Sequence, residues 1–105
     1  MTLTADEIAT YHEDGLVIPS NYRVSKDMLD RINAAYEKLL AENEGNPEFS
    51  ADFILGPHVS TTGSYGVNGD PVWLEFAQIP EVLDMLEQVI GPDIILWGVT
   101  IFGKN

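Results

Sequence analysis

The sequence predicts an α+β fold, and three patterns along its 105 residues indicate it. Thr4 and Glu7 have the capping-box spacing that begins many helices. After Ser25, apolar residues recur with the helical period over a long segment. The closing segment, residues 93–104, is rich in β-branched and aromatic side chains, which favour a strand. A chain of this length suits one small domain or part of a larger one, so we expect residues 1–105 to form a single domain or a fragment of one.

The first helix is expected to begin after Thr4 and to end at Gly15, because glycine readily adopts the left-handed conformation found at helix C-termini. Residues 16–19, with the sequence LVIP, then predict a short buried strand that proline closes. A second helix follows Ser25 and ends before the sequence GNP at residues 45–47. Its expected buried face consists of Met28, Leu29, Ile32, Ala35, Tyr36, Leu39 and Leu40.

Residues 48–70 predict a long loop, because glycines and turn sequences interrupt it and no hydrophobic period survives. A loop of that length in a compact domain is commonly functional. Asp70 and Pro71 then have the cap and first-turn preferences of a short helix that carries Trp73. Pro80 opens a fourth helix, which is expected to end at Gly91.

The closing strand is apolar on both faces from Ile94 to Phe102, as a strand buried within a larger sheet would be. Only residues 16–19 and 53–55 could pair with it. Two or three short strands cannot satisfy both edges of a strand and also cover both of its faces. The sequence therefore predicts that segment 94–102 was shaped for a larger sheet than these residues supply.

The formal net charge of −12, from 17 acidic and 5 basic residues, argues against nucleic-acid binding, which needs a basic surface. The same charge disfavours an electrostatic membrane anchor. The N-terminal residues show neither a basic leader nor an apolar run, and segment 94–102 is too short to span a bilayer. We therefore expect a cytoplasmic protein with no membrane partner. The absence of cysteine excludes a disulfide framework and thiolate metal sites.

His12 and Asp14 spell the His-x-Asp pair of two-histidine, one-carboxylate iron sites. Both fall in the last turn of the first expected helix, where residues two apart point about 200° away from each other. They cannot share a metal ion in that geometry, so we expect neither to be a metal ligand.

Three other residues are candidates for binding a small molecule. His58 lies in the glycine-rich loop, where a histidine either hydrogen-bonds within a turn or lines a pocket for an anionic co-substrate. Thr100 and Lys104 fall on one face of the closing strand by alternation, so they could line a polar pocket and meet a carboxylate. The alternative for Lys104 is an ordinary cation at the end of a strand.

A family resemblance rests on three segments taken in order. They read LTADEI through YHEDGLVIP (residues 3–19), PEVLD through IGPD (80–93) and LWGVTIFGK (96–104). The sequence GPD at the strand entry and the terminal lysine are the most specific parts. Together the segments resemble the N-terminal part of the phytanoyl-CoA dioxygenase (PhyH) family of iron(II)/2-oxoglutarate oxygenases.

The resemblance implies a double-stranded β-helix, or jelly-roll barrel, of which this chain holds the N-terminal helices and the first strands. It implies an enzyme that uses iron(II), 2-oxoglutarate and dioxygen to hydroxylate a small-molecule substrate. By position in the family pattern, it implies that Thr100 and His58 approach 2-oxoglutarate, and the lysine that ends the family's strand corresponds to Lys104.

The family's iron ligands, a His-x-Asp pair and a distant histidine, match no residue of this chain. Lys104 is followed by Asn105, where the family has a proline and then the ligand-bearing segment. The resemblance therefore implies no catalytic and no metal-binding residue among residues 1–105. A truncated chain of this kind is expected to bind neither iron(II) nor 2-oxoglutarate alone and to be inactive.

A second hypothesis comes from a different class of function. The chain is then a small acidic module that binds a partner protein, or a second copy of itself, by strand addition to segment 94–102. Charge alone also suggests a DNA mimic, but the acidic residues are spread over every expected helix and do not form one regular face.

Overall fold

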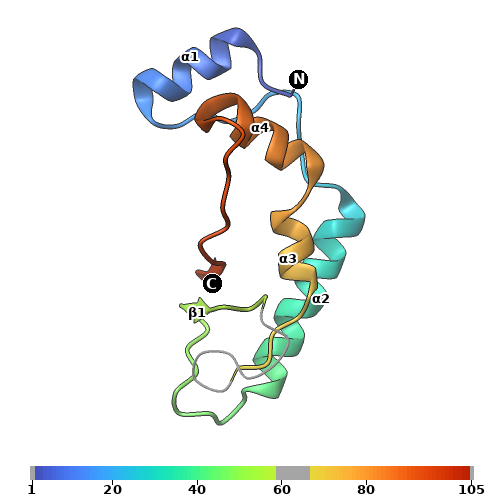
Figure 1. The fold of residues 1–105 in the computed structure, drawn as a ribbon. Helices are drawn as coiled ribbons and strands as arrows, with labels where there is room; N and C mark the ends of the chain where they lie inside the picture. The colour runs from blue at the N-terminus through green and yellow to red at the C-terminus, as the bar shows by residue number, and fades with distance from the viewer. Residues whose placement is uncertain (1, 59–66, 105) are drawn as a thin grey trace. The chain divides into compact units, whose positions relative to one another are not determined.

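The computed structural model describes residues 2–58 and 67–104, and it combines helices with a small antiparallel sheet of two strands. This confirms the mixed α and β content expected from the sequence. Figure 1 shows the elements in chain order. They are α1 (Ala5–Asp14), α2 (Lys26–Glu42), β1 (Ile54–Leu55), α3 (Val72–Ala77), α4 (Pro80–Ile90) and β2 (Thr100–Ile101). Within the described ranges, no helix is long and apolar enough to cross a lipid bilayer.

The described residues form two compact units. The first unit contains α1 and α4, from residues 2–24 and 78–95. The second unit contains α2, α3 and the sheet, from residues 25–58, 67–77 and 96–104.

In the first unit, α1 begins as its sequence predicts. The Thr4 hydroxyl accepts a hydrogen bond from the Glu7 amide at 3.1 Å, and the Glu7 carboxylate accepts one from the Thr4 amide at 2.9 Å. Gly15 ends the helix in the left-handed conformation, with φ of 76°. Helix α1 packs against α4, whose first residue is the expected Pro80.

The segment before α1 is also attached to α4. The Gln88 side chain forms two hydrogen bonds with the backbone of Leu3, at 2.9 and 3.0 Å, and Leu3 is buried. The Asp84 carboxylate accepts a hydrogen bond from the Thr2 amide at 2.7 Å. Side chains of α4 thus satisfy backbone groups that would otherwise be left to water.

The expectation of a buried strand at residues 16–19 is wrong. These residues follow α1 as irregular chain, and Leu16 and Ile18 are 67 % and 76 % exposed. A strand exists only where a neighbour accepts its backbone hydrogen bonds, and the described residues offer none here. A helix side chain binds the chain just beyond this segment, because the Ser20 amide donates to the Glu7 carboxylate at 2.8 Å.

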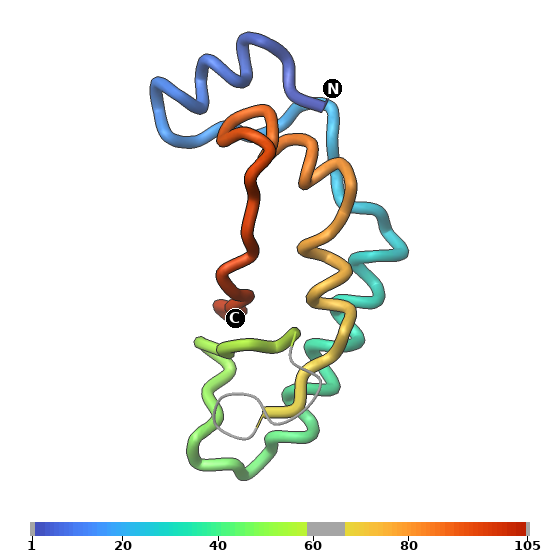
Figure 2. Tube along the Cα trace, in the orientation of Figure 1, coloured from blue at the N-terminus to red at the C-terminus, as the bar shows by residue number. Residues whose placement is uncertain are grey.

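The second unit has its core between α2 and the elements that face it. Ser25 caps α2 by accepting a hydrogen bond from the Met28 amide at 3.1 Å, as its sequence predicts. Asp70 caps the start of α3 through the Val72 amide at 2.8 Å. Helix α3 lies alongside α2, which Figures 1 and 2 both show. The buried core consists of Ala35, Leu39, Ile54, Val67, Val72 and Trp73.

The sheet is much smaller than the closing segment predicts. Strand β1 pairs with β2 in antiparallel register, with Ile54 opposite Ile101 and Leu55 opposite Thr100. The strand expected over residues 93–104 therefore forms only at two residues. Strand β1 comes from within the expected loop at 48–70, and residues 59–66 of that loop lie outside the described part of the chain.

Most of segment 94–102 is consequently exposed. Ile95 is 90 % exposed, Trp97 is as exposed as in an extended peptide (101 %), and Phe102 is 65 % exposed. Figure 2 shows the chain after α4 as an extended trace. Within this segment, Val99 and Ile101 are the residues that pack against the core of the second unit.

Candidate functional site

The second unit contains a pocket of about 290 Å³ beside the C-terminal residues, which we call the Lys104 pocket. Helix α2 supplies one wall and Trp73 of α3 another, while the chain after β2 closes the third side. The lining is mainly apolar and aromatic, with an amide, a phenol and an ammonium group among it. The residues are Ile32, Asn33, Tyr36, Trp73, Ile101, Phe102, Gly103 and Lys104.

Close packing at Gly103 fixes the position of Lys104. A Cβ atom on Gly103 would lie 2.1 Å from the carbonyl oxygen of Ala51 and 2.6 Å from the hydroxyl oxygen of Tyr36. Distances this short allow no side chain at residue 103 without movement of the backbone nearby. The backbone of residue 103 is thus held between a loop carbonyl and α2, and Lys104 follows it directly.

The charge of Lys104 is uncompensated within the described residues. Lys26 pairs with Asp30 at 2.7 Å and Lys38 with Glu42 at 3.8 Å. The remaining cations are also engaged: Arg31 pairs with Glu75, and Arg23 donates to the carbonyl oxygens of Pro19 and Tyr22. In a chain with net charge −12, a cation beside a pocket and without an ion pair in the described ranges is chemically distinctive.

This arrangement suits a small carboxylate with an apolar body. The Lys104 ammonium group is a point donor for a carboxylate, and Asn33 and Tyr36 add neutral hydrogen-bonding groups. The indole ring of Trp73 supplies apolar surface, and Trp73 is only 7 % exposed. Its Nε1 atom is buried and has no hydrogen-bond partner among the described residues.

Thr100 is not part of the Lys104 pocket. It lies in β2 opposite Leu55 and is exposed. The alternation that put Thr100 and Lys104 on one face assumed a regular strand through residue 104, but β2 ends at Ile101. Ile101 and Lys104 line the pocket together instead.

His58 lies at the other end of the sheet, beside the fully buried Pro57. It is half-buried, and its Nδ1 atom is buried without a hydrogen-bond partner among the described residues. The Pro57 carbonyl accepts a hydrogen bond from the Asp70 amide at 2.8 Å, which joins the two described ends of the loop. His58 is not among the residues that line the Lys104 pocket.

The described residues contain no group of three histidine, aspartate or glutamate side chains that could hold a metal ion. His12 is exposed on α1, with its ring 5.5 Å from that of Tyr11 in an edge-on arrangement. Asp14 is the last residue of α1 and is also exposed. The side chains that the structure describes therefore do not fit an iron(II) site.

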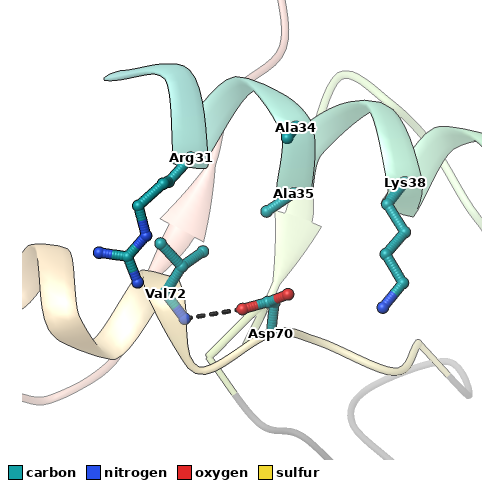
Figure 3. Close-up of a pocket in the computed structure, with 6 residues that line it drawn as sticks. All are labelled: Arg31, Ala34, Ala35, Lys38, Asp70 and Val72. Carbon is teal, nitrogen blue, oxygen red and sulfur yellow. Dashed lines mark hydrogen bonds between the residues drawn. The ribbon is translucent and has the colours of Figure 1, made fainter. Parts of the chain in front are cut away.

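A second hollow of the same unit, about 280 Å³, lies on another face of α2 (Figure 3). Arg31 and Lys38 stand at its two ends, one helical heptad apart, with Ala34 and Ala35 between them. The carboxylate of Asp70 points between the two cations and accepts the hydrogen bond from the Val72 amide. Because that carboxylate occupies the middle of the hollow, an anion gains less here than beside Lys104.

The first unit has an apolar groove of about 210 Å³ between α1, α4 and the residues just before and after α1, which are Leu3, Val17 and Pro19. Two carboxylates of the same unit, Glu7 and Asp84, accept hydrogen bonds from backbone amides. The hydrogen bond from the Thr4 amide, followed in size of effect by that from the Ser20 amide, lowers the pKa of Glu7. The hydrogen bond from the Thr2 amide lowers the pKa of Asp84 in the same way. Partial burial, followed by the nearby Glu81 carboxylate, raises the pKa of Tyr22. None of these shifts creates an acid–base pair in a pocket.

Two residues of the Lys104 pocket, Asn33 and Tyr36, are not among the candidates for binding that the sequence predicts. Tyr36 was expected on the buried face of α2, and Asn33 was not singled out. The available signal is their spacing of three residues, which places them on adjacent turns of one helix face. Trp73 serves as both core residue and pocket wall.

No family model matches the chain, and neither a curated protein nor a solved structure matches it. The Lys104 pocket and the exposure of segment 94–102 are therefore the features of the chain on which a functional assignment depends.

Proposed function

We propose that this chain is the N-terminal portion, or a truncated relative, of an iron(II)/2-oxoglutarate-dependent dioxygenase that hydroxylates a small molecule. The exposure of segment 94–102 carries the proposal. A strand that is apolar on both faces yet leaves Ile95 and Trp97 almost fully exposed is costly for a finished domain. In a jelly-roll barrel, neighbouring strands would cover both faces and pair with both edges.

The three segments that resemble the PhyH family support the same proposal from the sequence. The order of two helical segments, a GPD turn and an apolar segment followed by lysine resembles the N-terminal part of that family. The observed α1, α4 and β2 lie within these three segments.

Within this proposal, 2-oxoglutarate is bound only once the barrel is complete. Lys104 is then the residue that meets one of its carboxylates, and its pocket of aromatic walls and neutral hydrogen-bonding groups supports that role. Thr100 and His58 are assigned to the same co-substrate by family position alone. Since the described residues do not fit an iron site, no catalytic step is assigned to this chain.

The experiment compares the 105-residue chain with a protein extended to include a His-x-Asp segment, if the gene encodes one downstream. Both are incubated with iron(II), ascorbate and isotopically labelled 2-oxoglutarate, and labelled succinate is measured. We expect no succinate above the protein-free control from the chain alone, and uncoupled turnover from the extended protein. Robust turnover by the chain alone contradicts the proposal. A gene without a downstream His-x-Asp segment excludes the N-terminal portion of a longer enzyme and leaves the truncated relative.

A second candidate function is a small acidic module that binds protein partners by strand addition. The observation that favours it is the same open strand edge, taken as a finished binding surface. The two functions differ in what a longer protein does to the strand. A barrel buries Trp97 within one polypeptide, whereas a binding module leaves it exposed until a partner arrives.

A further inference from the structure

We propose that the apolar groove of the first unit binds a basic amphipathic helix of a partner protein, with apolar side chains on one face and lysines or arginines beside them. The groove lies between α1 and α4, and we call it the α1–α4 groove. The residues that line it all belong to the first unit, so its geometry does not depend on where the second unit lies. This surface is different from segment 94–102, and the inference does not depend on the oxygenase proposal.

The first unit covers little of its own apolar surface. Among its described residues, only Leu3 is buried, and neither α1 nor α4 contains a buried residue. Helix α4 nevertheless has one apolar side, which consists of Val82, Leu83, Met85, Leu86, Val89 and Ile90. A helix with such a side is normally covered by a second element of structure. The apolar side of α4 is therefore a surface on which another helix can pack.

The apolar surface continues past the groove along α4. Leu86 lines the groove, and it also lies between Leu83 and Ile90, three residues after the first and four before the second. Residues with these spacings are neighbours on a helix surface, so the three leucine and isoleucine side chains form one stripe. Leu83, Leu86 and Ile90 are 36 %, 37 % and 57 % exposed. At 1.5 Å per residue, the stripe is about 10 Å long.

A groove with a stripe along its edge suits a helix better than a small molecule. The groove of about 210 Å³ is larger than the cavities of about 150 Å³ that hold benzene, so it has room for one or two apolar side chains. Helices that bind in grooves insert side chains with the spacings i, i+3 or i+4, and i+7. The next such side chain of a bound helix would contact the stripe at Leu83 or Ile90. A small ligand within the groove would leave both of these residues uncovered.

The charges of the first unit favour a basic partner. The ionisable side chains of α4 are all carboxylates, and α1 carries further carboxylates and no lysine or arginine. These residues are Glu81, Asp84 and Glu87 in α4, and Asp6, Glu7, Glu13 and Asp14 in α1. Arg23 is the one lysine or arginine among the described residues of this unit, and it donates to backbone carbonyls. An acidic partner, or a second copy of the unit, would bring carboxylates together.

Two of these carboxylates lie beside the apolar surface. Glu87 is four residues after Leu83 and three before Ile90, so it borders the stripe. Asp14 is three residues after Tyr11, which lines the groove from α1. Both carboxylates are exposed, and neither forms an ion pair within the described residues. A helix that packs its apolar face on this surface can therefore direct lysines or arginines to a carboxylate on α1 and to another on α4.

The first test is calorimetric titration of the 105-residue chain with three synthetic peptides in about 0.1 M salt. The probe is a peptide of about 18 residues made of leucine and lysine, with the leucines at helical spacing. A scrambled peptide has the same composition but no apolar face, and a third peptide has glutamate in place of lysine. We expect the probe to bind with a Kd of about 1–100 µM, at least about tenfold more tightly than either of the other two. Equally tight binding of the scrambled or the glutamate peptide overturns the proposal.

The second test locates the binding site with matched variants in the two units. Leu86→Ala is compared with Leu29→Ala, since Leu29 is 46 % exposed on α2 of the second unit. Glu87→Lys is compared with Glu37→Lys, which makes the same change of net charge at an exposed residue of α2. We expect each first-unit variant to weaken binding of the probe at least about fivefold, and each α2 variant less than about twofold. Equal effects in the two units overturn the proposal.

The third test distinguishes a helix from a small ligand and does not depend on Leu86. Ile90→Ala truncates the most exposed side chain of the stripe, and Ile90 is not among the residues that line the groove. Far-UV circular dichroism checks that each variant keeps its helix content. We expect Ile90→Ala to weaken binding of the helical peptide about threefold or more, and to leave binding of octyltrimethylammonium, a small cationic amphiphile, unchanged. If the amphiphile binds as tightly as the peptide, or if Ile90→Ala affects neither, the groove is not a helix-binding site and the proposal is overturned.

Discussion

Gly103 and Tyr36 lie so close together that no side chain fits between them, since a Cβ atom on Gly103 would be 2.6 Å from the Tyr36 hydroxyl oxygen. The carbonyl of Ala51 crowds the same point at 2.1 Å. This contact joins the chain after β2 to α2 and so forms one side of the Lys104 pocket. Residue 103 must therefore be glycine because a Cβ atom would clash with its neighbours, and not because its backbone is left-handed.

Gly103→Ala should destabilise the second unit. The added methyl group meets a backbone carbonyl as well as a side chain, so relief needs movement of the backbone, and overpacking of this kind costs about 1–3 kcal/mol. The measurement is urea unfolding followed by far-UV circular dichroism. Gly98→Ala is the control, because its methyl group enters open space. Equal unfolding midpoints for the two variants would show that the contact at Gly103 is absent in solution.

Two leucines of α2 should respond differently to truncation. Leu39 is 2 % exposed in the core, so Leu39→Ala should lower the free energy of unfolding by about 2–5 kcal/mol. Leu29 is 46 % exposed on the same helix, so Leu29→Ala should cost less than about 1 kcal/mol. Both values come from urea unfolding of the second unit. A larger loss at Leu29 than at Leu39 would mean that another face of α2 is buried.

The two tryptophans should differ in their access to a quencher. Trp97 is fully exposed and Trp73 is 7 % exposed. Acrylamide should therefore quench the fluorescence of Trp73→Phe, which retains Trp97, much more strongly than that of Trp97→Phe. The samples are kept dilute so that the chain is monomeric. Similar quenching of both variants would show that Trp97 is covered by its own chain.

Acidification should loosen the first unit before the second. Hydrogen bonds from amides lower the pKa values of Glu7 and Asp84 below their ordinary values of 4.5 and 3.8. A carboxyl group with a lowered folded pKa stabilises the fold above its unfolded pKa, and this stabilisation is lost as the pH falls through the folded value. We therefore expect the Thr2 and Ser20 amides to lose protection below about pH 4, while the amides of α2 keep theirs.

The control for this titration is Glu7→Gln. The Thr4 amide donates to Oε1 of Glu7 and the Ser20 amide to Oε2, and glutamine replaces one of these two acceptor oxygens with an NH2 donor that does not titrate. Protection of the Ser20 amide should then be lower at neutral pH and should no longer change with acid. Protection that still falls with acid in this variant would assign the effect to another group. Hydrogen exchange followed by nuclear magnetic resonance reports both amides.

Elements whose determinants are local were predictable from the sequence. Thr4 with Glu7 begins α1, Ser25 begins α2, and Pro80 begins α4, because a cap or a first-turn proline acts within a few residues. Gly15 ends α1 for the same reason. Each of these signals needs no partner elsewhere in the chain.

Elements that require a distant partner were not predictable. Residues 16–19 and 93–104 have the composition of strands, but composition does not supply the neighbour that accepts the hydrogen bonds. Within these two segments, Thr100 and Ile101 pair with Leu55 and Ile54, and the Val99 carbonyl accepts a hydrogen bond from the Gly56 amide. Strand propensity alone therefore overestimated the sheet at both places.

The candidate site was predictable in part for the same reason. Lys104 could be singled out by its place after an apolar strand. Its neighbours Asn33 and Tyr36 come from α2, and their arrival beside it depends on how Gly103 packs. Thr100 was placed with Lys104 by an alternation that the chain does not follow beyond Ile101.

The central claim is that residues 95–98 remain uncovered by the rest of this chain, and amide hydrogen exchange in dilute monomer tests it most directly. Exchange of these four amides should occur close to the rate of an unstructured peptide, while the amides of Ala35 and Leu39 in α2 are strongly protected. Protection of residues 95–98 equal to that of the α2 core would contradict the account, because the apolar segment would then have its partners within its own polypeptide.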